Sequence, residues 1–362
     1  MTHRAPHFSL AVVAAAVMLP QAAEPQQPRA LKKADTEFPE PFSQVGGIRE
    51  LRDGRVIVID PREPQLALID MKTGSLTPIG KQGSGPGEWR APRALYRFAG
   101  DSTLVQDPPN GRFLILTPDG KPARIVDPSV GALSRASGLL QSIDLRGLMY
   151  YQGSGVQANA PIPLDSAVIG RFDPARQAHD TVGKVALGKA SFVATRLQDG
   201  RQARRLVGEP FSPGDAWNVF PDGRIAIARV GNYHLEILGT DGTVIKGQPV
   251  KYTPVKIGEA EKREWRAQLP GGSEPDSWPA VKPPFPANNA VWPMPNGETW
   301  VARSAAADAK QTSIDVFDRQ ARWTGMVTLP PGMTIVGVGA RHIYAVRTDA
   351  DDLKYLGRYA IP

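Results

Sequence analysis

The chain of 362 residues contains no cysteine. We therefore expect no disulfide bond, no thiolate metal site and no lipid attached to a cysteine. A domain of this length buries enough apolar surface to fold without disulfides, so the absence remains compatible with an oxidising compartment.

Long hydrophobic runs are also missing. The run from Phe8 to Leu19 follows a single basic residue, Arg4, and precedes two small residues, Ala22 and Ala23. This layout is typical of a secretory signal peptide, and the run is shorter than the roughly 20 residues that span a bilayer. We expect residues 1–23 to be a signal peptide and residues 24–362 to be exported, to the periplasm or the extracellular space, without a membrane span.

Charge runs and paired histidines are scarce as well. The formal net charge is +7, but the basic residues are dispersed along the chain. Because no Lys/Arg run or aromatic-studded basic motif occurs, we do not expect nucleic-acid binding. Past residue 23 only His179, His234 and His342 remain, without the paired spacing of a zinc site. No Gly-x-Ser-x-Gly nucleophile motif is present either.

Glycine and proline, in contrast, are abundant, with 36 and 35 copies spread along the chain. They lie between the short strands of a repeated unit, and within these strands apolar and polar residues alternate with a period of two. In the clearest copy, Asp53-Gly54 separates residues 47–51 from residues 56–60, and Thr73-Gly74 follows residues 66–70. Asp-Gly and Asn-Gly turns between such strands indicate an antiparallel meander.

The first turn of each unit gives the number of repeats. Its glycine or small residue recurs at six positions: Gly54, Gly100, Gly147, Gly223, Gly297 and Ala340. Three of the gaps have the 40 to 50 residues of one four-stranded propeller blade, and the two gaps around Gly223 are longer by about 30 residues. We therefore expect an all-β fold, a six-bladed β-propeller of four-stranded antiparallel blades with two insertions flanking blade 4. Eight blades are the alternative, but the long gaps hold Pro-rich and helix-like sequence.

These positions divide residues 24–362, a single domain, into blades. The expected boundaries are approximately 43–92, 93–138, 139–210, 211–288, 289–332 and 333–362. The last unit has only three strands, so we expect residues 29–38 to supply its outer strand and close the ring.

One inter-blade segment carries a more specific motif. Residues 79–92 read Ile-Gly-Lys-Gln-Gly-Ser-Gly-Pro-Gly-Glu-Trp-Arg-Ala-Pro. This segment resembles the inter-blade signature of NHL-like and TolB-like propellers, in particular of bacterial exported six-bladed propellers. The resemblance implies the fold and export, and it carries no catalytic residues over to this chain. Many relatives resemble lipoproteins, from which this chain departs by lacking the cysteine.

The candidate binding residues lie on connections between blades. An outer strand connects to the next inner strand on one face of the disc, so the loop of residues 83–90 and the insertions at about 189–210 and 251–288 are expected on the same face. The loop lacks the ending of a phosphate-binding P-loop, which favours a turn in which Trp89 packs between blades, with Glu88 and Arg90 as rim contacts. The candidate ligand contacts are Glu88, Trp89, Arg90, Trp217, Asn218, Trp265, Asn289 and Trp292.

Two of these groups have alternative interpretations. Trp265 lies in a predicted helix over residues 258–269 and either packs with Leu269 onto the disc or lines a pocket under a lid. Trp217, Asn218, Asn289 and Trp292 lie near the starts of inner strands, where they suit either blade packing or a flat polar ligand such as a sugar.

No metal or cofactor is predicted. If a cation is present, Ca²⁺ bound by oxygens of Asn218, Asn289, Glu50 and Asp144 is the expected site, although no spacing demands it. The favoured hypothesis is a monomeric, non-catalytic propeller that binds a small polar ligand or an envelope protein. A metal-assisted hydrolase or lactonase with its site in the channel, and a carbohydrate-recognition module, remain as alternatives.

Overall fold

The computed structural model describes residues 29–361 apart from residues 32, 64, 128–139, 156–161, 197–201, 269–274, 276 and 287. For residues 192–196, 202–205 and 268 it describes the backbone alone. The expected signal peptide, residues 1–23, lies outside the described residues.

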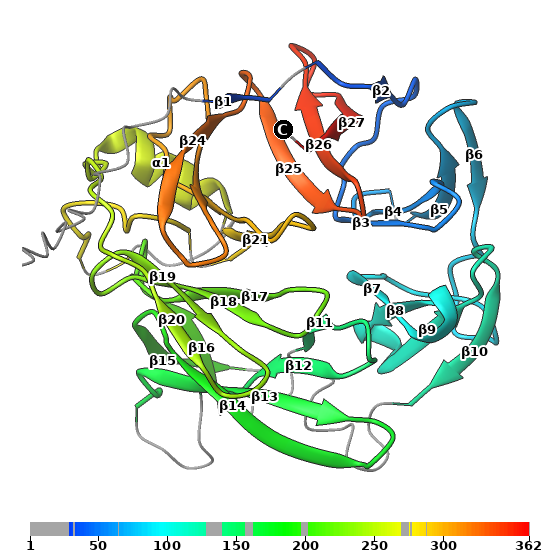
Figure 1. The fold of residues 1–362 in the computed structure, drawn as a ribbon, viewed down its shortest axis with the longest axis horizontal. Coiled ribbons are helices and arrows are strands. Elements are labelled where there is room, and N and C mark those ends of the chain that lie inside the picture. Colours follow the sequence, from blue (N-terminus) through cyan, green and yellow to red (C-terminus); the bar gives the residue numbers. More distant parts are fainter. Residues whose placement is uncertain are drawn as a thin grey trace, which may run out of the picture.

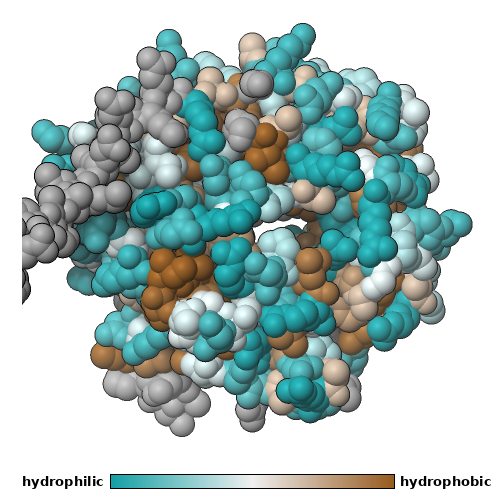
Figure 2. Space-filling model, viewed as in Figure 1, coloured by the Kyte–Doolittle hydropathy of each residue, from teal (hydrophilic) through white to brown (hydrophobic). Residues whose placement is uncertain are grey.

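Six antiparallel sheets, each with four strands of a blade, stand in a ring around a central axis (Figure 1). This arrangement confirms the six-bladed β-propeller. In space-filling view the ring has an opening near its centre that is bordered mostly by hydrophilic residues (Figure 2).

Each blade runs from an inner strand beside the axis to an outer strand at the rim. The inner strands are β3 (Gly47–Glu50), β7 (Ala94–Arg97), β11 (Leu140–Ile143), β17 (Ala216–Val219), β21 (Val291–Pro293) and β25 (Met333–Val338). The second strands are β4 (Val56–Asp60), β8 (Thr103–Asp107), β12 (Met149–Gln152), β18 (Ile225–Arg229), β22 (Thr299–Ala302) and β26 (His342–Thr348). The third strands are β5 (Gln65–Asp70), β9 (Arg112–Leu116), β13 (Ser166–Asp173), β19 (His234–Leu238), β23 (Ser313–Phe317) and β27 (Lys354–Ala360). The outer strands are β6 (Ser75–Pro78), β10 (Pro122–Val126), β14 (Ala178–Ala186), β20 (Val244–Lys246), β24 (Trp323–Thr328) and β2 (Thr36–Glu37).

The hydrophobic core lies in layers between neighbouring blades. The middle strands are rich in Val and Ile because both of their faces are covered, and every residue of β4 is buried. Ile57 of blade 1 and Leu114 of blade 2 belong to one such layer. The outer strands β10 and β20 are largely exposed, as expected for strands at the rim.

The glycines that mark the repeat share one conformation. Gly54, Gly100, Gly147, Gly223 and Gly297 all have φ between 65° and 90°, a region that other residues enter only at a cost. Each lies in the turn of the first hairpin of its blade, and Gly100 lies within the short 3-10 turn Ala99–Asp101. A second 3-10 turn, Pro108–Asn110, joins β8 to β9.

The amino-terminal segment closes the ring, as predicted, and also extends further. β2 pairs antiparallel with β27 and completes blade 6, with Thr36 opposite Arg358. The expectation placed all of residues 29–38 in that blade, but β1 (Arg29–Ala30) instead pairs in parallel with β24 of blade 5. Leu31 packs in the layer between blades 5 and 6, and Phe38 packs in the layer between blades 6 and 1. The segment therefore joins three blades.

Both predicted insertions flank blade 4. The first contains a two-stranded antiparallel hairpin of β15 (Ala190–Arg196) and β16 (Gln202–Gly208). The second contains the helix α1 (Glu259–Gln268). Because each insertion connects an outer strand to the next inner strand, both lead to the end of the disc where β17 and β21 begin.

Candidate functional site

A pocket of about 100 Å³ lies where the inner strands of blades 3, 4 and 5 begin, and we call it the channel-mouth pocket. Four of the predicted site residues, Trp217, Asn218, Asn289 and Trp292, line this pocket together. Gln141 and Gln152 of blade 3 also line it, and the sequence analysis missed both. They occupy the edge of blade 3 next to β17, so aligning the blades by their glycine turns could have revealed them.

Hydrogen bonds from side chains connect the three blades at this pocket. The Trp217 indole N–H donates to Oε1 of Gln152 over 3.0 Å, and the Asn218 amide donates to the backbone carbonyl of Val291 over 3.1 Å. The Gln141 amide lies 3.5 Å from the carbonyl oxygen of Trp217. Trp217 is buried in the layer between blades 3 and 4. Trp217 and Asn218 therefore form the wall of the pocket as well as the joints between blades.

Other polar groups of the pocket are not used by the fold. Asn288 and Asn289 are exposed and Trp292 is half-buried. Within the described part of the chain, none of these three side chains makes a hydrogen bond to another residue. Asn289 has φ of 54°, a left-handed conformation that Asn tolerates better than most residues. These groups remain available to a molecule in the pocket.

The carboxylate at the pocket, Asp215, is already hydrogen-bonded within the fold. Asp215 accepts hydrogen bonds from the backbone N–H groups of Ala186 and Val230 and from the guanidinium of Arg229, each over 2.9 Å. Burial alone would lower the pKa of Arg229, but its hydrogen bonds to Asp215 and Glu236 outweigh burial and raise that pKa. The same guanidinium also pairs with Glu236 over 2.7 Å, so donors of the fold already engage both oxygens of Asp215.

The second insertion contacts the segment that connects the first insertion to β17. Phe211, which precedes β17, lies 6.3 Å from Trp278 of the second insertion, between ring centroids. Trp265 of α1 packs edge-on against Trp278, with centroids 5.3 Å apart, and is not among the residues that line either pocket described here. Leu269, its predicted partner, lies outside the described residues.

Helix α1 is fixed to the disc by buried polar contacts. Nζ of Lys282 lies 3.0 Å from a carboxylate oxygen of Glu264 and donates to the carbonyl of Ala305 over 2.8 Å. Glu261 accepts backbone hydrogen bonds from Gly258 and Ala307, each over 3.0 Å. These contacts favour packing of the helix onto blade 5 over the lid interpretation.

The glycine loop (residues 83–90) forms a joint between blades 1 and 2. Trp89 is 4% exposed, and its indole N–H donates to the carbonyl of Ile79 over 2.7 Å. Glu88 accepts a hydrogen bond from the backbone N–H of Gly85, which together with the Lys81 ion pair lowers the pKa of Glu88. Arg90 is exposed, and its backbone N–H bonds to the buried carboxylate of Asp107. The loop is thus held by its own side chains.

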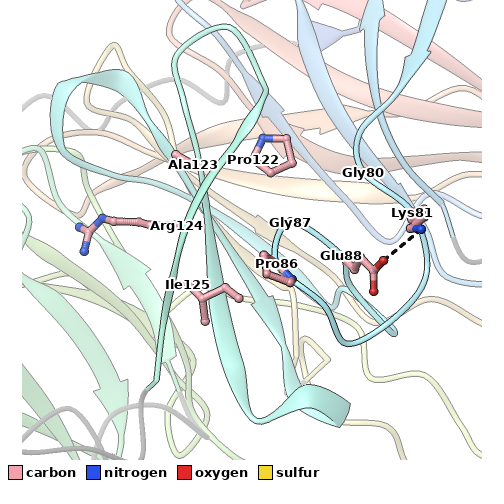
Figure 3. A pocket seen from close by; sticks show the side chains of 9 residues that line it. All are labelled: Gly80, Lys81, Pro86, Gly87, Glu88, Pro122, Ala123, Arg124 and Ile125. Carbon is pink, nitrogen blue, oxygen red and sulfur yellow. Dashed lines mark ion pairs between the residues drawn. The ribbon is translucent and has the colours of Figure 1, made fainter.

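A second and larger cavity, about 600 Å³, lies between this loop and strand β10 (Figure 3). Pro122 and Ile125 extend from β10 toward the loop, while Arg124 extends away from it (Figure 3). The ion pair of Lys81 and Glu88 borders the cavity. The sequence analysis did not predict this cavity, because the outer strand of blade 2 follows the loop only after three other strands.

The proposed oxygen ligands do not form one set. Asn218 and Asn289 line the channel-mouth pocket, whereas Glu50 and Asp144 do not. Glu50 accepts hydrogen bonds from the Tyr344 hydroxyl and the Ala340 backbone and contacts His342, and Asp144 binds Arg146. Among the residues that the structure describes, no three His, Cys, Asp or Glu side chains gather as a metal site.

The fold defines the protein as a six-bladed β-propeller. No protein-family model and no curated protein matches the chain. The described part of the chain also has no helix with the length and hydrophobicity needed to cross a bilayer.

The following three solved structures are similar to this chain over 90% or more of its length. One is a protein described as exported, from Bacteroides fragilis NCTC 9343, with 12% identity, a TM-score of 0.49 and coverage of 92% of this chain and 94% of that one. Another is a member of the DUF4221 family from Bacteroides vulgatus ATCC 8482, with 10% identity, a TM-score of 0.46 and coverage of 94% and 98%. A third is virginiamycin B lyase from Staphylococcus aureus, with 13% identity, a TM-score of 0.38 and coverage of 90% and 83%.

Proposed function

We propose that this propeller is an exported binding protein that holds a small polar ligand in the channel-mouth pocket. The observation that carries the proposal is a set of side chains there that make no hydrogen bond to another described residue: Asn288, Asn289 and Trp292. Polar groups that converge on a concave site next to an aromatic ring are typical of small-molecule binding sites.

The insertions support the same location. Phe211 has φ of 48°, and a bulky residue in that conformation costs on the order of 1–3 kcal/mol. The contact of Phe211 with Trp278 holds this backbone in place and joins the two insertions directly before β17. The second insertion ends at Asn288, which lines the pocket, and the first insertion ends a few residues before Asp215 of the same lining.

The test is a thermal-shift screen of residues 24–362 against neutral, anionic and cationic small molecules. A ligand that binds only the folded state raises the unfolding temperature. We expect a hit whose effect is lost in Asn289→Ala and kept in Asn232→Ala. Asn232 is an exposed Asn in the β18–β19 turn of blade 4 and does not line the pocket. A ligand that raises the unfolding temperature of both variants equally contradicts the proposed site.

The proposal requires neither a metal nor catalysis, and metal analysis separates it from the alternatives. A stoichiometric divalent ion that survives dialysis of the purified protein favours the metal-assisted hydrolase or lactonase instead. Fractionation of the producing cells and sequencing of the mature amino terminus test export. Recovery of the chain with Met1 in the cytoplasm contradicts the signal peptide.

A further inference from the structure

We propose that the channel-mouth pocket recognises an acetamido group, the N–C(=O)–CH₃ substituent of an N-acetylated sugar. This inference rests on the proposed function and names its ligand class. Three properties of the pocket support it: its size, its charge and the kinds of atoms that line it.

The size of the pocket fits a substituent better than a whole molecule. Its volume is about 100 Å³. Sites that enclose a whole drug-sized ligand usually begin at about 300 Å³. The pocket is therefore better suited to one substituent of a ligand, with the rest of the ligand outside it.

The charge of the pocket favours a neutral group. An anion would face the carboxylate of Asp215, and a cation would have to compete for its oxygens with Arg229 and the backbone N–H groups of Ala186 and Val230. Burying a charge without a partner is costly. A neutral amide avoids this cost.

The lining matches both ends of an acetamido group. Each unbonded Asn side chain offers an N–H₂ donor and a carbonyl acceptor, the two groups that an amide C=O and N–H require. The indole N–H of Trp292 is a further donor. Ala216 and Ala290 also belong to the lining, but they are 3% and 1% exposed and packed in the core between blades 4 and 5. The apolar surface open to a methyl group is therefore that of the half-buried Trp292.

The position of the pocket indicates where the sugar ring lies. The pocket opens at the starts of three inner strands, and Trp292 is half-buried at its edge. A sugar ring stacks its apolar face on such an indole while its hydroxyls stay in water. The sugar is therefore favoured over a peptide amide, which would gain no such stacking.

The experiment measures binding of N-acetylglucosamine to residues 24–362 by ligand-observed NMR, with glucose, glucosamine, acetate and N-acetylalanine amide as comparison probes. We expect N-acetylglucosamine to bind with a millimolar to submillimolar Kd and the other four probes to bind at least about tenfold more weakly, a difference of about 1.4 kcal/mol. Asn289→Ala should weaken binding of N-acetylglucosamine about fivefold or more, and Asn232→Ala should leave it unchanged. Equal circular dichroism spectra and unfolding temperatures show that both variants are folded.

Several outcomes overturn the inference. Glucose binding as tightly as N-acetylglucosamine removes the acetamido group as the determinant, and N-acetylalanine amide binding equally well removes the sugar. Both results leave the proposed function standing if binding still depends on Asn289. If no molecule of either panel binds in an Asn289-dependent manner, the proposed function fails together with the inference.

Discussion

The side-chain amide of Asn218 on β17 donates a hydrogen bond across a blade boundary to the backbone carbonyl of Val291 on β21, 3.1 Å away. Its own carbonyl oxygen accepts the backbone N–H of Val219 over 2.8 Å. One half-buried residue thus joins the inner strands of blades 4 and 5 inside the wall of the channel-mouth pocket. Its position links the stability of the ring to the shape of the pocket.

Replacing this residue tests that link. Asn218→Ala should lower the free energy of unfolding by about 1 kcal/mol, since it removes two hydrogen bonds at a partly solvated site. Urea unfolding of the variant and of the control Asn232→Ala measures the effect. We expect the control to change stability by less than about 0.5 kcal/mol, as is usual for exposed positions. Equal stability of the two variants contradicts the blade-joining role.

The joint between blades 1 and 2 depends on Trp89. Trp89→Ala should cost about 3–5 kcal/mol, because it opens a cavity in the core layer. Trp89→Phe keeps most of the ring and loses the hydrogen bond to Ile79, so it should cost less, about 1–3 kcal/mol including the unsatisfied carbonyl. Chemical denaturation followed by circular dichroism distinguishes the two. A loss below 1 kcal/mol for Trp89→Ala is the result that contradicts a buried joint.

Two adjacent residues of the amino-terminal segment that closes the ring, Glu37 and Phe38, differ in burial and can be compared directly. Phe38 is fully buried between blades 6 and 1, whereas Glu37 makes a partly exposed ion pair with Arg347. Phe38→Ala should destabilise the protein by about 3–5 kcal/mol, and Glu37→Ala by no more than about 1 kcal/mol. Thermal and urea unfolding measure both variants. If the two substitutions have similar effects, the segment does not close the ring through its buried side chain.

The attachment of α1 should weaken in acid. Glu261 accepts backbone hydrogen bonds from Ala307 and Gly258, which lower its pKa from 4.5 to about 2. Because the folded state favours the charged form, this stabilisation is fully present above about pH 4.5, declines as the pH falls and is lost below about pH 2. The bond from the Gly258 N–H to Glu261 is one half of a capping box at the start of the helix, since glycine has no side chain to form the other half.

Urea unfolding at pH 6 and pH 3 measures this contribution. The wild type should lose more stability between these pH values than Glu261→Gln, which has no charge to titrate at that position. Glu259→Gln, in the same turn, serves as the control. Its ion pair with Lys262 also lowers the pKa of Glu259, but that side chain is largely exposed, so the profile of this variant should lie close to that of the wild type. Parallel pH profiles for the wild type and Glu261→Gln exclude Glu261 as the group responsible.

Much of the architecture could be predicted from local sequence features. Turns such as Asp53-Gly54 and Asp222-Gly223 fix hairpins through the positive φ of glycine, and period-two alternation between them defines the strands. Their spacing gave six blades, two insertions beside blade 4 and an amino-terminal closing strand. These properties follow from residues that are neighbours in the chain, so they can be read without knowing the fold.

Other features depended on the tertiary structure. Gln152 lies beside Trp217, Trp265 packs on Trp278, and strand β10 forms a cavity with the glycine loop. Each of these contacts depends on how neighbouring blades or insertions pack. The pairing of β1 with blade 5 involves two residues with no distinguishing pattern.

The candidate site shows the same division. The sequence by itself determined that Trp217, Asn218, Asn289 and Trp292 stand near the starts of inner strands. Only the tertiary structure decided that they share one pocket, that Asn218 is used in joining blades and that Asn289 is left unbonded. The reason is physical: strand positions follow from local backbone preferences, but the hydrogen-bond partners of a side chain depend on which blade is placed beside it.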